Sequence, residues 1–275
     1  MTFKELKLND AIIKGLSSNG FEEPTEVQAK VIPIFLANKN VFVKSIKENN
    51  RKTQAIIVAP TRELAVQIMG QAKLFGSAMR NVKFVSLIGG EDIRRQTTNL
   101  RDSQVVIGTP GRIQDHLNRG TLRLNNVQTI ILDEADEMLK MGFKNEIDAI
   151  FKEAPDEIQV GLFSATINAK VKHLATAYMQ DYEYIEIDNV LKVNNNITNT
   201  FIFTKGISKD DLLIKVIKDH DMQRTIIFSN TKSSTDKISK RLRDAGIKSL
   251  VINGDKRQSQ RTRAIKMLKT MKHQF

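Results

Sequence analysis

Short apolar runs alternate with longer amphipathic stretches over the first two thirds of the chain. Each run is short, rich in Val and Ile, and followed by polar or turn-forming residues. Runs of this kind between amphipathic helices are typical of parallel strands that are buried on both faces. The runs are Asn40–Lys44, Ala55–Ala59, Lys83–Ile88, Val105–Gly108, Thr129–Leu132, Val160–Phe163 and Tyr184–Ile187. The pattern predicts an α/β domain built on a parallel sheet.

The pattern breaks at residues 189–200, where the chain becomes polar and rich in Asn, as linkers often are. Three more strand candidates follow, at Ile197–Thr204, Thr225–Ser229 and Ser249–Ile252, with helical stretches between and after them. We therefore expect a first α/β domain over residues 1–190, a linker over residues 191–200, and the opening part of a second α/β domain over residues 201–275. A length of 275 residues is enough for one or two such units.

Composition narrows the class of protein. Cysteine is absent, which excludes a disulfide framework and a thiolate site. No window approaches the roughly 18 apolar residues of a membrane span, and the N-terminus lacks the apolar core of a signal peptide. The four histidines lie far apart, so a transition-metal site is not expected. These features predict a cytoplasmic protein.

The net charge of +12 is unevenly distributed. Residues 1–188 hold 24 basic and 24 acidic side chains, whereas residues 189–275 hold 19 basic and 7 acidic ones, so the whole excess lies in the last third. A basic region beside a neutral one favours a polyanionic partner, with RNA or DNA the first candidates. The alternative is a solvated, lysine-rich surface that keeps the protein soluble.

Two adjacent carboxylates follow one of the predicted strands. Ile130–Leu132 leads directly into Asp133 and Glu134. In phosphate-loop ATPases a carboxylate in this position holds Mg²⁺, and the next one orients or deprotonates the attacking water. The alternative is a strand that runs into an acidic helix N-terminus, which the helix dipole favours in any case.

Further polar motifs follow the other strands, at the sheet edge where open α/β folds place their ligands. Helix-start N–H groups, Thr hydroxyls and Arg side chains suit a sugar-phosphate backbone. Each motif alone is weak, since Thr-Pro-Gly is also an ordinary turn, but their joint order is hard to obtain by chance. The motifs are Pro60-Thr61-Arg62, Gly89-Gly90, Thr109-Pro110-Gly111-Arg112 and Ser164-Ala165-Thr166.

With Asp133-Glu134-Ala135-Asp136, these motifs resemble those of bacterial DEAD-box RNA helicases, matched along essentially the whole chain. The resemblance implies two RecA-like domains that couple ATP hydrolysis to local RNA unwinding, with ATP and Mg²⁺ as cofactors. It implies Asp133 as metal ligand and catalytic residue with Glu134. It implies that Ser164, Ala165 and Thr166 couple hydrolysis to strand separation. It assigns sequence-nonspecific RNA contacts to Pro60, Thr61, Arg62, Gly89, Gly90, Thr109, Pro110, Gly111 and Arg112.

The resemblance extends to both ends of the chain. Residues 20–28 are similar to the family's adenine-recognition motif, which implies roles for Phe3, Phe21, Thr25 and Gln28. Gln28 would read the adenine, Phe3 would stack on it and Thr25 would assist. The alternative is that Phe3 and Phe21 are core residues. In the second domain, Phe228, Gln258 and Arg261 fall in segments that contact RNA in the family.

The sequence departs from the family in two places. The family has a phosphate-binding loop of the form A-x-T-G-x-G-K-T after its first strand, but no glycine occurs here between Gly20 and Gly70. About two dozen residues, the loop and its helix, are predicted to be missing near Ser45. The family's later arginine-bearing segments also have no counterpart before Phe275. Three interpretations stay open: an RNA helicase by family whose ATPase activity is deficient in this chain; an ATP-independent RNA-binding remnant; or a non-functional fragment.

Overall fold

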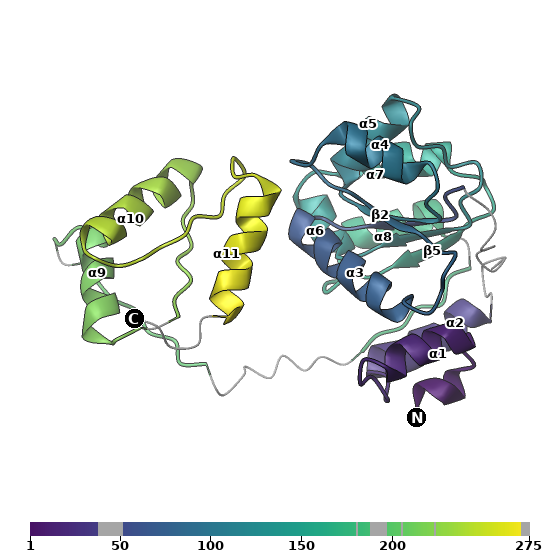
Figure 1. Cartoon of the computed structure of the whole chain (residues 1–275), viewed down its shortest axis with the longest axis horizontal. Helices are drawn as coiled ribbons and strands as arrows, with labels where there is room; N and C mark the ends of the chain where they lie inside the picture. Colours follow the sequence, from purple (N-terminus) through teal and green to yellow (C-terminus); the bar gives the residue numbers. More distant parts are fainter. Residues whose placement is uncertain (38–51, 180, 188–196, 205, 223, 271–275) are drawn as a thin grey trace. The chain divides into compact units, whose positions relative to one another are not determined.

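The computed structural model describes residues 1–37, 52–179, 181–187, 197–204, 206–222 and 224–270. The chain divides into two compact units, Met1–Asp188 and Asn189–Phe275 (Figure 1). This division lies close to the domain boundary predicted at residue 190. The predicted first strand, Asn40–Lys44, and almost all of the junction after it lie outside the described residues.

A five-stranded parallel sheet forms the centre of the first unit, in the order β2-β3-β1-β4-β5. Ala55 in β1 pairs with Val105 in β3 on one side and with Thr129 in β4 on the other. The strands are β1 (Ala55–Val58), β2 (Phe84–Leu87), β3 (Val105–Gly108), β4 (Thr129–Leu132) and β5 (Gln159–Leu162). Five of the predicted strands and the parallel α/β class are thus confirmed.

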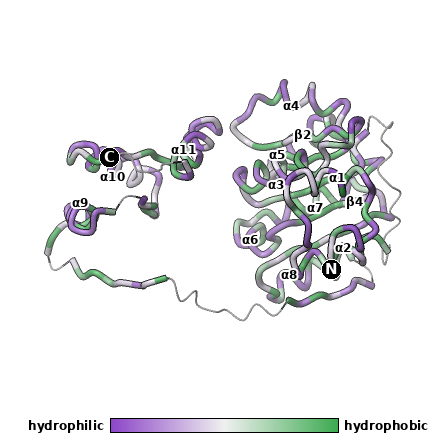
Figure 2. The backbone as a smooth tube through the Cα atoms, turned by 60° about the horizontal axis from the view of Figure 1, so that its bottom comes forward, coloured by the Kyte–Doolittle hydropathy of each residue, from purple (hydrophilic) through white to green (hydrophobic). Residues whose placement is uncertain are grey.

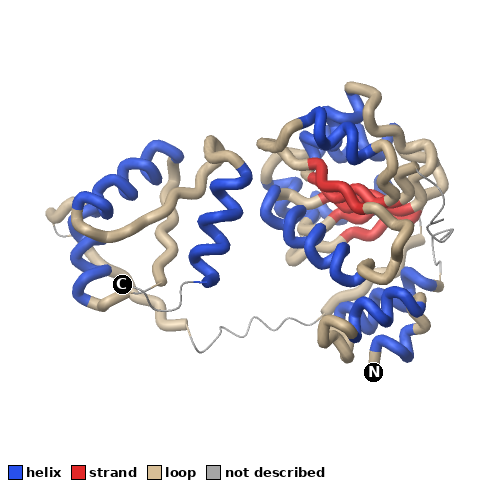
Figure 3. Tube along the Cα trace, in the orientation of Figure 1, coloured by secondary structure: helices blue, strands red, loops and turns tan. Residues whose placement is uncertain are grey.

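Helices cover both faces of this sheet (Figure 3). Several begin at side chains that accept a backbone N–H of the first turn, as Thr61, Asp92 and Asn168 do, which satisfies donors that the helix itself leaves unpaired. The helical elements are η1 (Phe3–Leu6), α1 (Asp10–Ser17), α2 (Glu26–Leu36), α3 (Arg62–Phe75), α4 (Ile93–Leu100), α5 (Pro110–Asn118), α6 (Ala135–Lys140), α7 (Lys144–Glu153) and α8 (Ala169–Tyr178).

The two sheet faces belong to separate apolar cores, and Figure 2 shows the apolar residues along the strands. Alternate residues such as Ile56 and Ile130 pack against Ile113 of α5 and Ile147 of α7. Their neighbours on the strands face α3 instead. Ile57 is half-buried and packs in this second core. Burial on both faces explains why these strands read as continuous apolar runs.

A row of glutamines precedes the strands at the edge opposite the predicted motifs. Gln54, Gln104 and Gln128 stand immediately before β1, β3 and β4, and Gln159 begins β5. The Gln104 Oε1 accepts the backbone N–H of Lys83 at 2.8 Å, and the Gln159 Oε1 accepts the Thr129 hydroxyl at 3.2 Å. Amide side chains thereby satisfy polar groups where the sheet's hydrogen bonding ends.

The predicted strand at Tyr184–Ile187 is wrong. These residues form neither strand nor helix, and Tyr184 is 55% exposed. A strand needs the backbone groups of a neighbour. The described residues provide no neighbouring strand for this segment.

The second unit contains three helices among its described residues: α9 (Lys209–Asp219), α10 (Lys232–Asp244) and α11 (Gln258–Thr270). The predicted strands at 197–204, 225–229 and 249–252 are wrong as strands, because no ladder is assigned to them in the described part of the chain (Figure 3). Their apolar side chains are largely exposed, Phe201 by 88% and Phe228 by 92%. Without two covered faces, these runs lack the burial that stabilises a parallel sheet.

Candidate functional site

The predicted motifs of the first unit meet at one edge of the sheet. The Asp133 N–H donates to the Val58 carbonyl at 2.9 Å, and the Ala59 N–H donates to the Gly108 carbonyl at 2.9 Å. On the next strand pair, the Thr109 N–H donates to the Leu87 carbonyl at 3.0 Å. These bonds continue the strand pairing one residue beyond the assigned strands. They bring the segments that begin at Asp133, Pro60, Thr109 and Gly89 side by side, as the sequence predicted.

Glu134 has an unusual backbone at this edge. Its φ of 52° and ψ of 51° place it in the left-handed region, and it is the N-cap of α6. Such a conformation is uncommon for a residue with a side chain and often marks functional sites. Its backbone N–H donates to the Asp133 Oδ1 at 3.0 Å, which holds the Asp133 carboxylate against the start of α6.

Asp133 and Glu134 both have a raised pKa. Burial raises the pKa of Asp133, and the N–H of Glu134 lowers it only in part. Burial also raises the pKa of Glu134, as do the charges of Asp133, Glu137 and Asp136. Neither carboxylate has a salt bridge among the described residues. An oxygen-only pair short of positive charge suits a hard cation such as Mg²⁺, so Asp133 fits the predicted ligand role.

Asp136 joins the acidic motif to the segment after β5. The Thr166 hydroxyl donates to its Oδ2 at 2.6 Å, and the Ser164 hydroxyl donates to the Thr166 carbonyl at 2.8 Å. Burial would raise the pKa of Asp136, but hydrogen bonds from Thr166 and Ser164 outweigh it and the pKa is lowered. The side chain is only 2% exposed, and its Oδ1 has no hydrogen-bond partner. The predicted coupling residues therefore contact the acidic motif directly.

Two arginines flank the glycine turn after β2. A Cβ added at Gly89 would lie 3.0 Å from the Arg62 Nη2, so the Arg62 guanidinium packs closely against this glycine and would have to shift slightly for a larger residue. From the other side, the Arg112 Nη1 donates to the Glu91 carbonyl at 3.2 Å. Gly90 has a φ of 81°, a left-handed conformation that favours glycine. Three predicted RNA-binding motifs thus form one continuous surface.

The predicted adenine-binding residues lie together near the N-terminus. Thr25 caps α2, and Thr25 and Gln28 exchange hydrogen bonds in a capping box, with the Thr25 N–H 2.9 Å from the Gln28 Oε1. Phe21 is 40% exposed and packs edge-to-face on Phe75. Phe3 is 5% exposed and belongs to a small apolar core with Leu6 and Leu16, so its open ring face is small. Their role in nucleotide binding stays a prediction.

The predicted residues of the second unit differ widely in environment. Phe228 is 92% exposed, whereas Gln258 is 6% exposed and its Oε1 has no partner. The Arg261 Nη1 donates to the Asn253 carbonyl at 3.0 Å, which ties α11 to the segment before it. Their contact with RNA stays a prediction.

Sequence reasoning missed a buried polar cluster beside the glycine turn. Gln96 of α4 is 3% exposed and His116 of α5 is fully buried; Gln96 accepts a hydrogen bond from Arg112, and His116 contacts the same Gln96 oxygen. One signal could have indicated it: Arg112 and His116 are four residues apart and share a helix face. Nothing in the sequence pointed to Gln96 as their partner.

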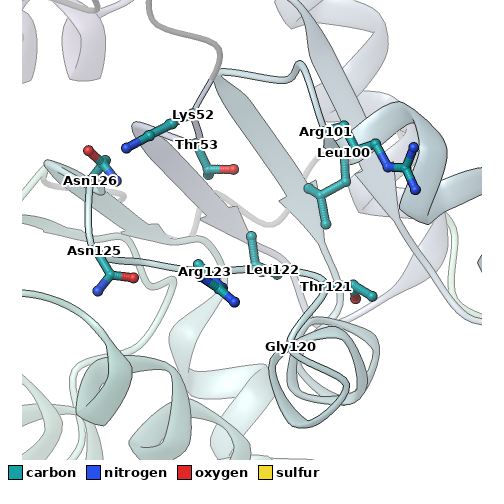
Figure 4. Close-up of a pocket in the computed structure, with 10 residues that line it drawn as sticks. All are labelled: Lys52, Thr53, Leu100, Arg101, Gly120, Thr121, Leu122, Arg123, Asn125 and Asn126. Carbon is teal, nitrogen blue, oxygen red and sulfur yellow. The ribbon is translucent and has the colours of Figure 1, made fainter.

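A pocket of about 470 Å³ lies at the opposite edge of the sheet, before the strands begin (Figure 4). It contains none of the predicted site residues and is therefore separate from the motif edge. Its lining is Lys52, Thr53, Leu100, Arg101, Gly120, Thr121, Leu122, Arg123, Asn125 and Asn126. Thr53 is buried there, and its hydroxyl donates to the Ser103 carbonyl at 3.4 Å.

The described residues contain neither a helix that could span a membrane nor a group of side chains arranged to bind a metal ion. None of their helices is both long and apolar enough to cross a membrane. They also hold no group of three or more His, Cys, Asp or Glu side chains arranged to bind a metal ion.

Two family models match the chain. The DEAD/DEAH box helicase model matches residues 41–174, and the helicase conserved C-terminal domain model matches residues 208–275. One match falls within each of the two predicted domains.

Curated relatives match almost the whole chain. A probable ATP-dependent RNA helicase of Methanocaldococcus jannaschii is 37% identical over 289 residues, covering 99% of this chain and 77% of the relative. The helicase CshA of Bacillus subtilis is 35% identical over 287 residues, covering 98% of this chain and 58% of the relative. Since 99% of 275 residues is about 272, the first alignment leaves about 17 positions of the relative without a counterpart here.

Solved structures share the fold. A DEAD box protein from Methanococcus jannaschii has a TM-score of 0.64 at 37% identity, covering 98% of this chain and 77% of that one. Saccharomyces cerevisiae Dbp5, solved bound to RNA and ADP BeF3, has a TM-score of 0.79 at 22% identity, covering 97% and 73%. The identity and coverage of these relatives, with the motifs at one sheet edge, show that the chain belongs to the DEAD-box family of ATP-dependent RNA helicases.

Proposed function

We propose that this chain binds the sugar-phosphate backbone of RNA without sequence preference, and that its ATP turnover is absent or negligible. The observation that carries the first half is the surface formed by Arg62, Gly89 and Arg112. Guanidinium groups and a glycine turn that admits close approach suit phosphate groups rather than base edges. The RNA in the solved complex of Dbp5, a protein of the same fold, is consistent with this proposal.

The charge distribution supports the same partner. Residues 189–275 carry the whole excess of +12. Basic side chains on a unit that belongs to an RNA helicase family favour phosphate contacts over a merely solvated surface. In this proposal, Phe228, Gln258 and Arg261 of the second unit take part in RNA binding, as the family motifs imply.

The proposal for ATP starts from groups that are present. Asp133 suits a Mg²⁺ ligand, and Glu134 beside it, with its raised pKa, suits a residue that orients or deprotonates water. When bound, ATP and Mg²⁺ would supply the phosphoryl group and the charge that stabilises its transfer. Gln28, with Phe3, Phe21 and Thr25, remains the candidate group to contact the adenine.

The phosphate-binding loop is the missing part. Lys52-Thr53 is the only local match to the end of such a loop, and the structure places Thr53 before β1, whereas Asp133 follows β4. Because the strands are parallel, Thr53 and Asp133 lie at opposite edges of the sheet. Lys52 and Thr53 line the pocket at that opposite edge, so they are badly placed to serve the phosphates near Asp133.

The length of the alignment also supports a lost segment. About 17 positions of the Methanocaldococcus relative have no counterpart in this chain, so the alignment leaves room for a missing segment of this kind. Without backbone N–H groups and a lysine around the β- and γ-phosphates, the metal at Asp133 would be poorly anchored. Glu134 would then face no positioned γ-phosphate, and turnover would be lost.

Titration of a fluorescein-labelled oligo(U) with the full chain at several salt concentrations tests the RNA half of the proposal. We expect weak binding. The logarithm of the association constant should fall linearly with the logarithm of the salt concentration, with a slope of about 0.7 for each phosphate contacted. Arg62→Gln should weaken binding and lower that slope. Arg80→Gln, an equal charge change on an exposed residue beyond α3, should change the slope little. Affinity that does not depend on salt would contradict the proposal.

A further inference from the structure

Gln96 occupies the junction between the glycine turn and α5. Its Nε2 donates to the Ile88 carbonyl at 2.9 Å and to the Glu91 Oε2 at 3.2 Å, so it holds the turn from within. Its Oε1 accepts the Arg112 Nη1 at 2.8 Å. A single buried amide therefore connects two of the predicted RNA-binding motifs.

His116 supplies a second hydrogen bond to the same oxygen. Its Nε2 lies 3.1 Å from the Gln96 Oε1, and its Nδ1 lies 2.8 Å from the Thr121 Oγ1. Two other partners set the orientation of the Gln96 amide. The Ile88 carbonyl can only accept, so it faces the Gln96 Nε2, and the Arg112 guanidinium can only donate, so it faces the Gln96 Oε1. His116 must then donate from Nε2. The single proton of the Thr121 hydroxyl can go to Nδ1 at 2.8 Å or to the His116 carbonyl at 3.1 Å, and a neutral ring requires the first.

The electrostatics agree with a neutral ring. Burial lowers the pKa of His116, and the positive charge of Arg112 lowers it further. Asp115 opposes this shift, and Arg119 adds to it. The ring therefore acts as a fixed hydrogen-bond donor toward Gln96.

These contacts fix the orientation of the Arg112 guanidinium. Its Nη1 donates inward to Gln96 and to the Glu91 carbonyl. Its Nε is 3.8 Å from an Asp115 carboxylate oxygen, beyond hydrogen-bond range, and its Nη2 has no hydrogen bond within the described ranges. The side chain is 16% exposed. The Asp115 carboxylate forms a loose ion pair with the Nε, so the Nη2 is the nitrogen left for a ligand, and its N–H groups can donate to a phosphate oxygen.

We propose that Gln96 and His116 are positioning residues for RNA, which fix Arg112 and the Gly89–Gly90 turn as one preformed phosphate-binding surface. Neither residue contacts RNA itself. His116 holds the Gln96 oxygen, Gln96 holds one nitrogen of Arg112, and the Nη2 of the guanidinium binds phosphate. Preorganisation of this kind raises affinity because the guanidinium need not be ordered on binding. The inference rests on the RNA binding proposed above.

A double-mutant cycle on the full chain tests this relay of contacts from His116 through Gln96 to Arg112. Arg112→Gln should weaken oligo(U) binding about tenfold and lower the salt slope by about 0.7, as the loss of one phosphate contact predicts. His116→Leu should lower the slope by a similar or smaller amount although the charge is unchanged. In the Arg112→Gln background, His116→Leu should add little, because both changes break the same chain of contacts.

Rescue and charge controls separate positioning from general stability. His116→Gln places an N–H donor near the position of Nε2, and should restore the slope that His116→Leu loses. Arg80→Gln removes an equal charge from an exposed side chain beyond α3 that contacts none of these residues, and should leave the slope near the wild-type value. Circular dichroism melts of each variant report folding independently. If His116→Leu fails to fold, His116→Gln and Gln96→Leu take its place in the comparison. Gln96→Leu should then lower the slope of the salt dependence as Arg112→Gln does.

The outcomes for the two proposals differ. Wild-type protein that binds oligo(U) without salt dependence would overturn the proposed function and the relay with it. Salt-dependent binding that Arg112→Gln weakens, but whose slope a folded His116→Leu leaves unchanged, would overturn the relay alone. Full additivity of His116→Leu and Arg112→Gln would have the same meaning.

Discussion

The two units contain similar apolar runs and treat them in opposite ways. In the first, Ile56 and Ile130 are fully buried in strands that are paired on both sides. In the second, Ile226 is 62% exposed and Phe228 is 92% exposed in chain that has no assigned strand. The local sequences, Ala-Ile-Ile-Val and Thr-Ile-Ile-Phe, are almost equally strand-like. Strand propensity alone therefore does not decide the outcome.

Burial decides it. A parallel sheet is stable when helices cover both of its faces, because each fully buried Ile or Phe contributes roughly 1.5–3 kcal/mol relative to exposure. The first unit covers both faces and separates two cores. Among the described residues of the second unit, three helices leave most of the apolar run residues open to water. Most of the burial that stabilises the described residues therefore lies in the first unit, together with the acidic pair and the glycine turn.

Amide hydrogen exchange should show the largest difference. Amides of β4 (Thr129–Leu132) are paired and buried, so they should exchange only through global or near-global unfolding, slowed by roughly 10³-fold or more. Amides of residues 225–228 have no assigned strand and should exchange close to the rate of an unstructured peptide. Mass spectrometry of exchanged fragments measures both. Equal protection in the two segments would mean that the second unit forms a sheet.

Cavity mutations test the same contrast as energy. Ile130→Ala removes buried methyl groups from the main core and should lower the free energy of unfolding by roughly 2–5 kcal/mol. Ile226→Ala is the matched control and should change it by no more than about 0.5 kcal/mol, since the side chain is already exposed. Urea titrations followed by circular dichroism give both values. A large loss at Ile226 would show that the second unit has a core that the contrast denies.

A smaller effect is expected at the polar joint of the first unit. Thr166→Val removes the hydrogen bond to buried Asp136 and should cost about 1–3 kcal/mol at neutral pH. Because the pKa of Asp136 is lowered on folding, its contribution is present above the ordinary carboxyl pKa of about 3.9 and is lost as the pH falls through the lower folded value. The difference between Thr166→Val and wild type should therefore shrink in acid. Stability measured from pH 7 to pH 3 tests this, and a difference that grows in acid would contradict it.

The sequence was sufficient for the parallel sheet and its motif edge. Apolar runs placed β1 to β5 because strands buried on both faces need continuous Val and Ile. The motifs followed because parallel strands present all their C-terminal ends at one edge. Asp133, Arg62 and Thr109 could be placed together from that topology alone.

The rest depended on contacts that no local pattern encodes. Gln96 has no motif around it, and its role appears only when α4 brings it between Ile88 and Arg112. The burial of Phe3 in the N-terminal core likewise follows from packing between η1 and α1. The strands predicted in the second unit failed because propensity does not say whether both faces will be covered.

We propose that the chain keeps the motif edge and the acidic pair of its family, and that its ATP turnover is absent or negligible. ATP hydrolysis by the purified full chain, measured with and without oligo(U), tests it most directly, with Glu134→Gln as the matched variant. The account predicts turnover at background level in both proteins, with or without RNA. RNA-stimulated turnover that disappears in Glu134→Gln would contradict it, because activity from a contaminant would not respond to that change.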